Sequence, residues 1–148
     1  MAELSGRPAG KGRRFAIVAS RFNEDICGKM VERARAEAQK LKAECTVVSV
    51  PGALEIPLAL QWMAQSGRFD ALVAVGAVIR GDTYHFDVVA NESARGVMDV
   101  MLEFGVPVAN AILTTDNERQ AQARLDKGAE AVRVAIEMAR MKAGFSGT

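Results

Sequence analysis

The sequence predicts an α/β fold in which a parallel sheet is covered by helices on both faces. Two observations predict it. Short apolar runs alternate along the chain with longer segments whose apolar residues recur at helical spacing. The short runs are apolar throughout, which is typical of strands buried on both faces of a sheet.

The first half of the chain contains two such strand and helix pairs. Arg14–Ser20 (RFAIVAS) predicts a buried strand, and Cys45–Val50 predicts a second one that ends at the turn-forming pair Pro51-Gly52. The helix between them carries apolar residues every three or four positions, at Ile26, Met30, Ala34, Ala38 and Leu41.

A second helix is predicted over Ile56–Gln65. Proline is tolerated only in the first turn of a helix, so Pro57 places the start of this helix near Leu54 or Glu55. The clearest buried strand of the chain follows, over Ala71–Ile79.

The second half repeats the alternation. A long helix is predicted up to Phe104, and Val106–Leu113 is predicted to be a fourth strand. Thr115 with Glu118 has the spacing of a capping box and predicts the start of the next helix. After a short break, a last helix is predicted to end near Lys142.

Composition narrows the class of protein. We expect residues 1–12, rich in Gly, Pro and basic side chains, to be a flexible arm, and residues 13–148 to form one domain. A net charge of +1 gives no electrostatic reason to expect nucleic acid or a membrane as partner. No secretory signal is evident, and Cys27 and Cys45 lack metal-ligand spacing, so we expect a cytoplasmic protein.

Ligands of such sheets bind beyond the carboxyl ends of the strands, so the loops there are the places to search. After the first strand, Phe22 is suited to stack on a planar ligand and Asn23 to hydrogen-bond it, although packing of Phe22 under the next helix is favoured from this residue alone. After the second strand, Gly52 admits a ligand and Glu55 suits hydroxyl groups, with a helix-dipole role for Glu55 as the favoured alternative.

The loop GDTYHFD follows the third strand and is the most informative. Backbone N–H groups of Asp82 and Thr83 and the Thr83 hydroxyl are suited to hold a phosphate, provided that the Asp82 carboxylate points away or pairs with Arg80. His85 is the only histidine, and histidine is the side-chain type most suited to proton transfer near neutral pH. Two roles for His85 stay open at this point: proton transfer, or a solvated or helix-capping residue.

Farther along, Arg124 and Lys127 are candidates for gripping a phosphate, against the favoured alternative of a solvated helix face. The chain has no G-x-x-x-x-G-K-[ST] loop, no G-x-G-x-x-G motif and no nucleophile elbow. With a single histidine and no carboxylates that can be placed beside it, we predict no metal site.

Several stretches of the sequence, in the order in which they occur, closely resemble the 6,7-dimethyl-8-ribityllumazine synthase family of riboflavin biosynthesis. The resemblance runs from about Arg14 to Met141 and rests on RFNEDI, VPGALEIPLA, GAVIRGDTYHFDVVANESARG, ILTTDNERQAQAR and KGAEAV. It implies a flavodoxin-like three-layer sandwich with a four-stranded parallel sheet. It also implies condensation of 5-amino-6-(D-ribitylamino)uracil with 3,4-dihydroxy-2-butanone 4-phosphate, without metal or redox cofactor, by a homopentamer with sites between subunits.

The resemblance assigns roles to individual residues. Phe22 stacks on the pyrimidine with Asn23 beside it, and His85 transfers protons. Arg124 grips the phosphate from the adjacent subunit, with Lys127 near it. The remaining contacts fall into three groups: Ala53, Leu54 and Glu55 along the ribityl chain, Ala77, Val78 and Ile79 at the ring edge, and Asp82 and Thr83 at the phosphate.

Two departures from the family pattern qualify this picture. Asn110 stands where the family usually has an aromatic residue that contacts the neighbouring subunit's ligand, and only Leu-Asp separates Arg124 from Lys127, where many relatives have a longer kink. We therefore expect a pentamer or a pair of pentamers rather than a sixty-subunit shell. The alternatives are a relative that binds a lumazine or flavin without turnover, a shell protein, and a flavodoxin-like electron carrier. The electron carrier is disfavoured because the loop SRFNED of this chain lacks the run of hydroxyl residues that would hold a flavin phosphate.

Overall fold

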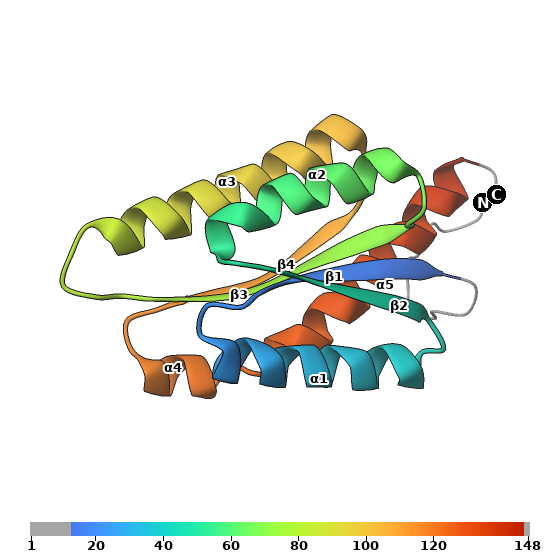
Figure 1. The fold of residues 1–148 in the computed structure, drawn as a ribbon. Coiled ribbons are helices and arrows are strands. Elements are labelled where there is room, and N and C mark those ends of the chain that lie inside the picture. The colour runs from blue at the N-terminus through green and yellow to red at the C-terminus, as the bar shows by residue number, and fades with distance from the viewer. Residues whose placement is uncertain (1–12, 147–148) are drawn as a thin grey trace.

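The computed structural model describes residues 13–146, in which strands and helices alternate (Figure 1). The arm predicted over residues 1–12 lies outside the described residues, and the single domain over 13–148 stays a prediction. The elements are β1 Arg14–Ser20, α1 Glu24–Lys40, β2 Glu44–Val50, the 3-10 turn η1 Ala53–Glu55, α2 Ile56–Ser66, β3 Ala71–Ile79, α3 His85–Phe104, β4 Val108–Thr115, α4 Glu118–Gln122 and α5 Lys127–Phe145.

The four strands form one parallel sheet in the order β2-β1-β3-β4. The two central strands are the most apolar, and β3 is buried along all but its last residue. A continuous apolar run in the sequence therefore marks a strand that is covered on both faces.

Alternate side chains of the sheet enter two separate cores. Phe15 and Ile17 of β1 face α1 and α5, whereas Ala16 and Val18 face α2 and α3. Figure 1 shows α2 and α3 above the sheet and α1 and α4 below it, and α5 packs in the same core as α1. The predicted three-layer, flavodoxin-like α/β fold is confirmed. Among the described residues, no helix is both long and apolar enough to cross a membrane.

Two glycines allow neighbouring helices to pack closely. One lies between α1 and α5, and the other lies between α2 and α3. A Cβ atom added to Gly128, at the start of α5, would collide with the backbone carbonyl oxygen of Met30 in α1. A Cβ atom added to Gly96 of α3 would lie 2.5 Å from Cγ of Pro57 in α2. Both helix pairs therefore pack closer than any side chain would allow at these positions.

Two predictions for the chain after α3 are wrong: the bounds of the fourth strand and the residue that caps the next helix. The fourth strand begins and ends two residues later than predicted, because its last residues, Thr114 and Thr115, pair with the end of β3. The predicted capping box at Thr115 is also wrong, since the Thr115 hydroxyl donates instead to the Asn117 carbonyl at 3.0 Å. Asn117 caps α4, where its side-chain oxygen accepts from the N–H of Gln120 at 2.9 Å.

The strand order locates the binding crevice. The chain runs from β1 outward to β2 and then crosses back over β1 to β3, so the strand order reverses between β1 and β3. In open parallel sheets ligands bind at such a switch point, beyond the carboxyl ends of the strands. The loops after β1, β2 and β3 surround this place.

Candidate active site

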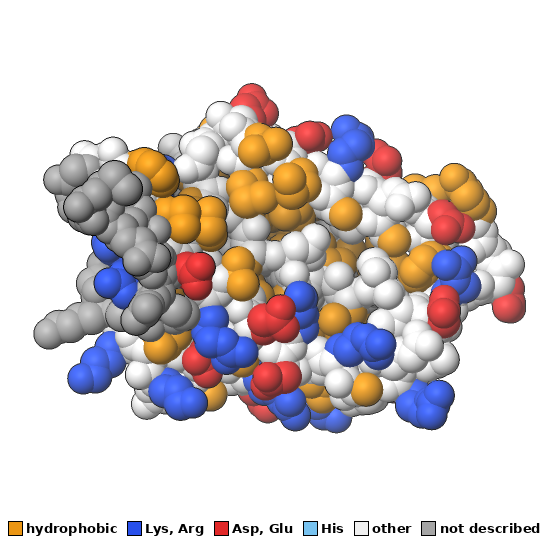
Figure 2. All heavy atoms as spheres, turned by 180° about the vertical axis from the view of Figure 1, so that it is seen from behind, with side chains coloured by type: hydrophobic (Ala, Val, Ile, Leu, Met, Phe, Trp, Pro, Cys, Tyr) orange, Lys and Arg blue, Asp and Glu red, His pale blue; other side chains and the backbone are white. Residues whose placement is uncertain are grey.

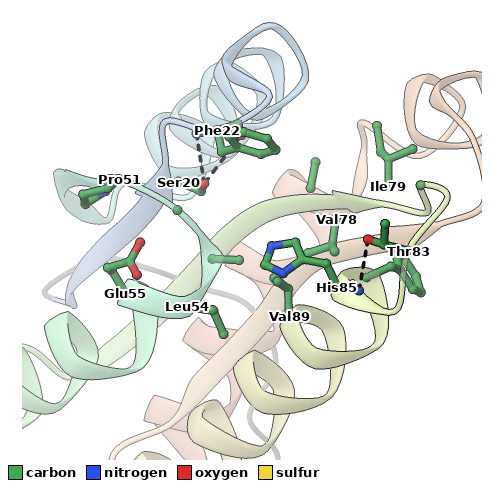
Figure 3. Close-up of a pocket in the computed structure, with 15 residues that line it drawn as sticks. Ser20, Phe22, Pro51, Leu54, Glu55, Val78, Ile79, Thr83, His85 and Val89 are labelled. Carbon is green, nitrogen blue, oxygen red and sulfur yellow. Dashed lines mark hydrogen bonds between the residues drawn. The ribbon is translucent and has the colours of Figure 1, made fainter.

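A cavity of about 430 Å³ opens beyond the carboxyl ends of β1, β2 and β3 (Figure 3). Its size is that of a small-molecule site. It brings together nine of the predicted site residues: Phe22, Ala53, Leu54, Glu55, Ala77, Val78, Ile79, Thr83 and His85. It is also lined by Gly52, which was predicted to admit a ligand, and by five residues that were not predicted, namely Ser20, Pro51, Gly81, Phe86 and Val89.

Phe22 stands at the rim, and its surroundings hold it there. Its side chain is 69% exposed, so the alternative that it packs in the core is wrong. Its N–H donates to the Ser20 hydroxyl at 3.1 Å. Asn23, in the left-handed conformation with φ 58°, donates from Nδ2 to the Ala77 carbonyl at 2.8 Å. Asn23 therefore ties the Phe22 loop to β3 and does not itself line the cavity.

The turn after β2 supplies a second wall. Leu54 is 42% exposed and faces the cavity, and the Glu55 N–H donates to the Gly52 carbonyl at 3.1 Å. The Glu55 carboxylate folds over this turn, with Oε1 3.2 Å from the place that a Cβ on Gly52 would occupy. Glycine at this position thus leaves room for the carboxylate at the cavity edge.

The loop after β3 supplies the third wall and the only histidine. α3 begins at His85 with no side-chain cap from Tyr84, and the Thr83 hydroxyl accepts from the His85 N–H at 3.4 Å. Figure 3 shows the imidazole extending from the start of α3 toward the turn that carries Leu54. The residues that line the cavity include two titratable side chains, Glu55 and His85, and no lysine or arginine.

Five predicted residues do not line the cavity of their own chain: Asn23, Asp82, Asn110, Arg124 and Lys127. Arg124 donates from Nη1 to the Gln120 carbonyl at 2.8 Å, and Lys127 lies 3.1 Å from Glu130 Oε1. Asn110 accepts the Ile112 N–H at 2.8 Å with its own Oδ1.

Of the two alternatives expected for Asp82, that its carboxylate points away or that it pairs with Arg80, the pairing is not made. Arg80 instead contacts Asp116 and Asp87, which come from β4's end and from α3. Asp82 is exposed. Among residues 13–146, no three His, Cys, Asp or Glu side chains gather where they could hold a metal ion.

The cavity combines groups with distinct chemical uses. An exposed aromatic ring at the rim can stack on a planar ligand, and an imidazole can exchange protons near neutral pH. Hydroxyl groups of Ser20 and Thr83 offer hydrogen bonds, and the walls are otherwise largely apolar. These features suit acid–base chemistry on a planar, polar molecule.

Comparison with known proteins identifies the family. Residues 12–143 match the family model for 6,7-dimethyl-8-ribityllumazine synthase. A protein of that name from Chromobacterium violaceum is 56% identical over 137 residues, which cover 90% of this chain and 88% of the relative. Proteins of the same name from Cupriavidus necator and Burkholderia multivorans are 55% and 54% identical and cover 92% and 89% of this chain, and 84% and 79% of the relatives. The chain therefore belongs to the 6,7-dimethyl-8-ribityllumazine synthase family and is an enzyme of riboflavin biosynthesis.

Proposed function

We propose that this cavity condenses 5-amino-6-(D-ribitylamino)uracil with 3,4-dihydroxy-2-butanone 4-phosphate to give 6,7-dimethyl-8-ribityllumazine. The observation that carries the proposal is the meeting of Phe22, Glu55, Thr83 and His85 around one cavity in a chain of this family. Each of these side chains is of the type that one part of the two substrates requires.

The pyrimidine stacks on Phe22, and its ribityl chain lies along the turn at Ala53, Leu54 and Glu55. The Glu55 carboxylate accepts hydrogen bonds from ribityl hydroxyls. The backbone of Ala77, Val78 and Ile79 meets the ring edge, at the end of the strand that forms the cavity floor. Asn23 keeps the Phe22 loop at the correct distance from this strand through its bond to Ala77.

The reaction needs proton transfers and no net oxidation. The amine of the pyrimidine attacks the ketone and loses water to give an imine, phosphate then leaves, and ring closure releases a second water. His85 is the proton-transfer residue at the mouth of the cavity. Thr83 and the N–H groups of the loop at Asp82 hold the phosphate, and alignment of the two substrates supplies further acceleration.

The phosphate carries negative charge, yet the side chains that line the cavity provide no permanent positive charge. We therefore assign the phosphate grip to Arg124 of a neighbouring subunit, with Lys127 near it. Exposed Phe22 and Leu54 at the rim suit coverage by that neighbour.

A homopentamer, or a pair of pentamers, is the assembly that we propose. β4 is an edge strand of the sheet, and a second, apolar cavity of about 610 Å³ lies beside its start. Leu102, Met138 and Phe145 line it and are exposed. Figure 2 shows hydrophobic side chains gathered on this side of the molecule, near the chain ends. Such a surface is typical of a subunit interface.

The two cysteines of the chain are free thiols, as in a reducing compartment, and we place the enzyme in the cytoplasm. Asn110, on the outer strand β4, replaces an aromatic contact to the neighbour's ligand with a polar residue. We expect weaker ligand binding from this change, with turnover retained.

The test is turnover of the two substrates, followed by the appearance of the coloured lumazine, for the wild type and His85→Ala. We expect product from the wild type and a loss of roughly 10- to 1,000-fold in kcat for the variant, the range of a general acid–base group. Unchanged turnover in the variant would remove His85 from the mechanism. A folded wild type that binds a lumazine tightly but forms none would instead indicate a binding protein.

A further inference from the structure

We propose that Arg80 is a positioning residue for the reaction, which holds the first turn of α3 and thereby the imidazole of His85. The inference rests on the proposed function, because it takes His85 as the proton-transfer group. Arg80 directly follows β3, which ends at Ile79, and it does not line the cavity.

Arg80 contacts the two residues that follow His85. Its guanidinium lies over the ring of Phe86 at 4.4 Å from the centroid, which is cation–π distance. Its Nη1 lies 3.8 Å from Oδ1 of Asp87. The guanidinium therefore reaches across the loop and contacts two consecutive residues of the first turn of α3.

The other end of the grip is fixed. Arg80 Nε donates to Oδ1 of Asp116 at 3.0 Å, and the Arg80 N–H donates to the Thr115 carbonyl at 2.8 Å. The Asp116 N–H in turn donates to Oε1 of Gln120 at 2.8 Å. Arg80 thus connects the start of α3 to a hydrogen-bonded turn at the end of β4.

Few polar contacts other than those of Arg80 hold this turn from outside, although Phe86 and Val89 also pack against the core beneath it. α3 begins without a side-chain cap, and the bond from the His85 N–H to the Thr83 hydroxyl is long, at 3.4 Å. The loop residues from Gly81 to His85 are all exposed. We infer that the contacts of Arg80 with Phe86 and Asp87 add to this apolar packing and fix the direction of the imidazole.

The contacts of Arg80 favour a positioning role over binding of the substrate phosphate. The guanidinium lies between two carboxylates, whose negative charges offset its own and oppose the approach of an anion. A positioning residue acts mainly on kcat, whereas a phosphate ligand acts mainly on KM for the phosphorylated substrate. Because the Arg80 side chain is 49% exposed, its ion pairs contribute little to global stability.

The experiment is a double-mutant cycle in the full chain with Arg80→Met, His85→Ala and the combined variant. We expect Arg80→Met to lower kcat by roughly 10- to 100-fold, the effect of a small misplacement of a reacting group, with KM nearly unchanged. In the His85→Ala background the same change should lower kcat no further, since the group that it positions is gone. Arg80→Lys should fall between wild type and Arg80→Met, because an ammonium cannot stack and bridge two carboxylates together.

Arg95→Met is the matched control. Arg95 also lies between two carboxylates of α3, with Nη2 2.6 Å from Glu92 and Nη1 3.3 Å from Asp99, but it does not line the cavity. We expect it to keep wild-type kcat. Asp116→Asn weakens the fixed end of the grip without changing Arg80, and it should lower kcat in the same direction by a smaller factor.

The possible results separate the two claims. Equal losses from Arg80→Met with and without His85, or an effect confined to KM of the phosphate substrate, would overturn the positioning role alone. An unchanged kcat in His85→Ala would overturn the proposed role of His85 and the Arg80 proposal with it. Should Arg80→Met fail to fold by circular dichroism, Asp116→Asn in the two backgrounds completes the same cycle.

Discussion

Two segments of this chain carry candidate catalytic groups, and their surroundings differ. The loop after β3, with Thr83 and His85, borders a cavity whose lining has no lysine or arginine. The segment from the end of α4 to the first residue of α5, with Arg124 and Lys127, carries cations but does not border that cavity. We infer that one chain holds two incomplete halves of different sites, which become complete only when subunits meet.

Of the variants that test this comparison, Arg124→Ala should have the largest effect. Removal of a charge-assisted phosphate contact should raise KM for the phosphorylated substrate by roughly 10- to 100-fold, with a smaller change for the pyrimidine. Steady-state kinetics with each substrate varied in turn measures both. Lys127→Ala is the comparison variant, and its effect should be smaller because Lys127 already pairs with Glu130. An unmoved saturation curve for the phosphorylated substrate would contradict the role of Arg124.

Gly128→Ala tests how the Arg124 segment is supported. The added Cβ would collide with the backbone of Met30, so α5 must move away from α1. We expect a net loss of roughly 1–3 kcal/mol in the free energy of unfolding, although alanine favours the helix itself. Gly96→Ala should cost less, since the ring of Pro57 rather than backbone must shift.

Gly28→Ala in α1 is the control for both glycine variants, because nothing lies within 4 Å of its added Cβ. It should be neutral or stabilising by up to about 1 kcal/mol, the difference in helix propensity. Urea unfolding of the three variants measures the series. An order in which Gly128→Ala is the mildest would show that α1 and α5 are not held together at this point.

Phe22→Ala tests the half-site that borders the cavity. Loss of an aromatic stacking surface should raise KM for the pyrimidine substrate roughly 10-fold and leave KM for the phosphorylated substrate nearly unchanged. Because Phe22 is 69% exposed, the melting temperature should change little. Equal changes in the two KM values would place Phe22 outside the pyrimidine subsite.

The smallest effect is expected at Cys27, which lies beneath the Phe22 loop and donates from Sγ to the Phe22 carbonyl at 3.4 Å. Burial, together with the nearby Glu24 carboxylate, raises the pKa of the Cys27 thiol to about 11. The reactive thiolate is therefore scarce at pH 8 and grows only as the pH rises toward that value. Alkylation by iodoacetamide, followed by mass spectrometry, should be slow at pH 8. Labelling as fast as in urea would show that this loop opens readily.

The sequence predicted the fold well where burial decides it. The bounds of β1 and β3 are as predicted, because Arg14–Ser20 and Ala71–Ile79 are nearly continuous apolar runs on both faces of the sheet. The end of β4 was wrong because Thr114 and Thr115 are polar, and their strand conformation comes from pairing with Val78 and Ile79. Local propensity carries no record of that partner.

The site was only partly predicted, again because some of its contacts join residues that are distant in the sequence. The motif match located Phe22, Glu55 and His85, which the structure places around one cavity. It missed the contacts of Arg80 with Asp87 and Asp116, since Asp82, the nearest carboxylate in sequence, was the one partner considered for Arg80. The actual partners come from the helix turn and the next strand end, which only the three-dimensional arrangement brings together.

The central claim, that neighbouring subunits complete each site, is tested most directly by mixing two impaired variants and assaying them at a phosphorylated-substrate concentration far below the KM of Arg124→Ala. His85→Ala and Arg124→Ala chains would be unfolded together, reassembled, and assayed against each variant reassembled alone. If sites are shared, about a quarter of those in an equal mixture combine an intact His85 from one chain with an intact Arg124 from its neighbour, and activity returns. Activity no greater than the sum of the separate variants would show that each chain builds its site alone, and would contradict the account.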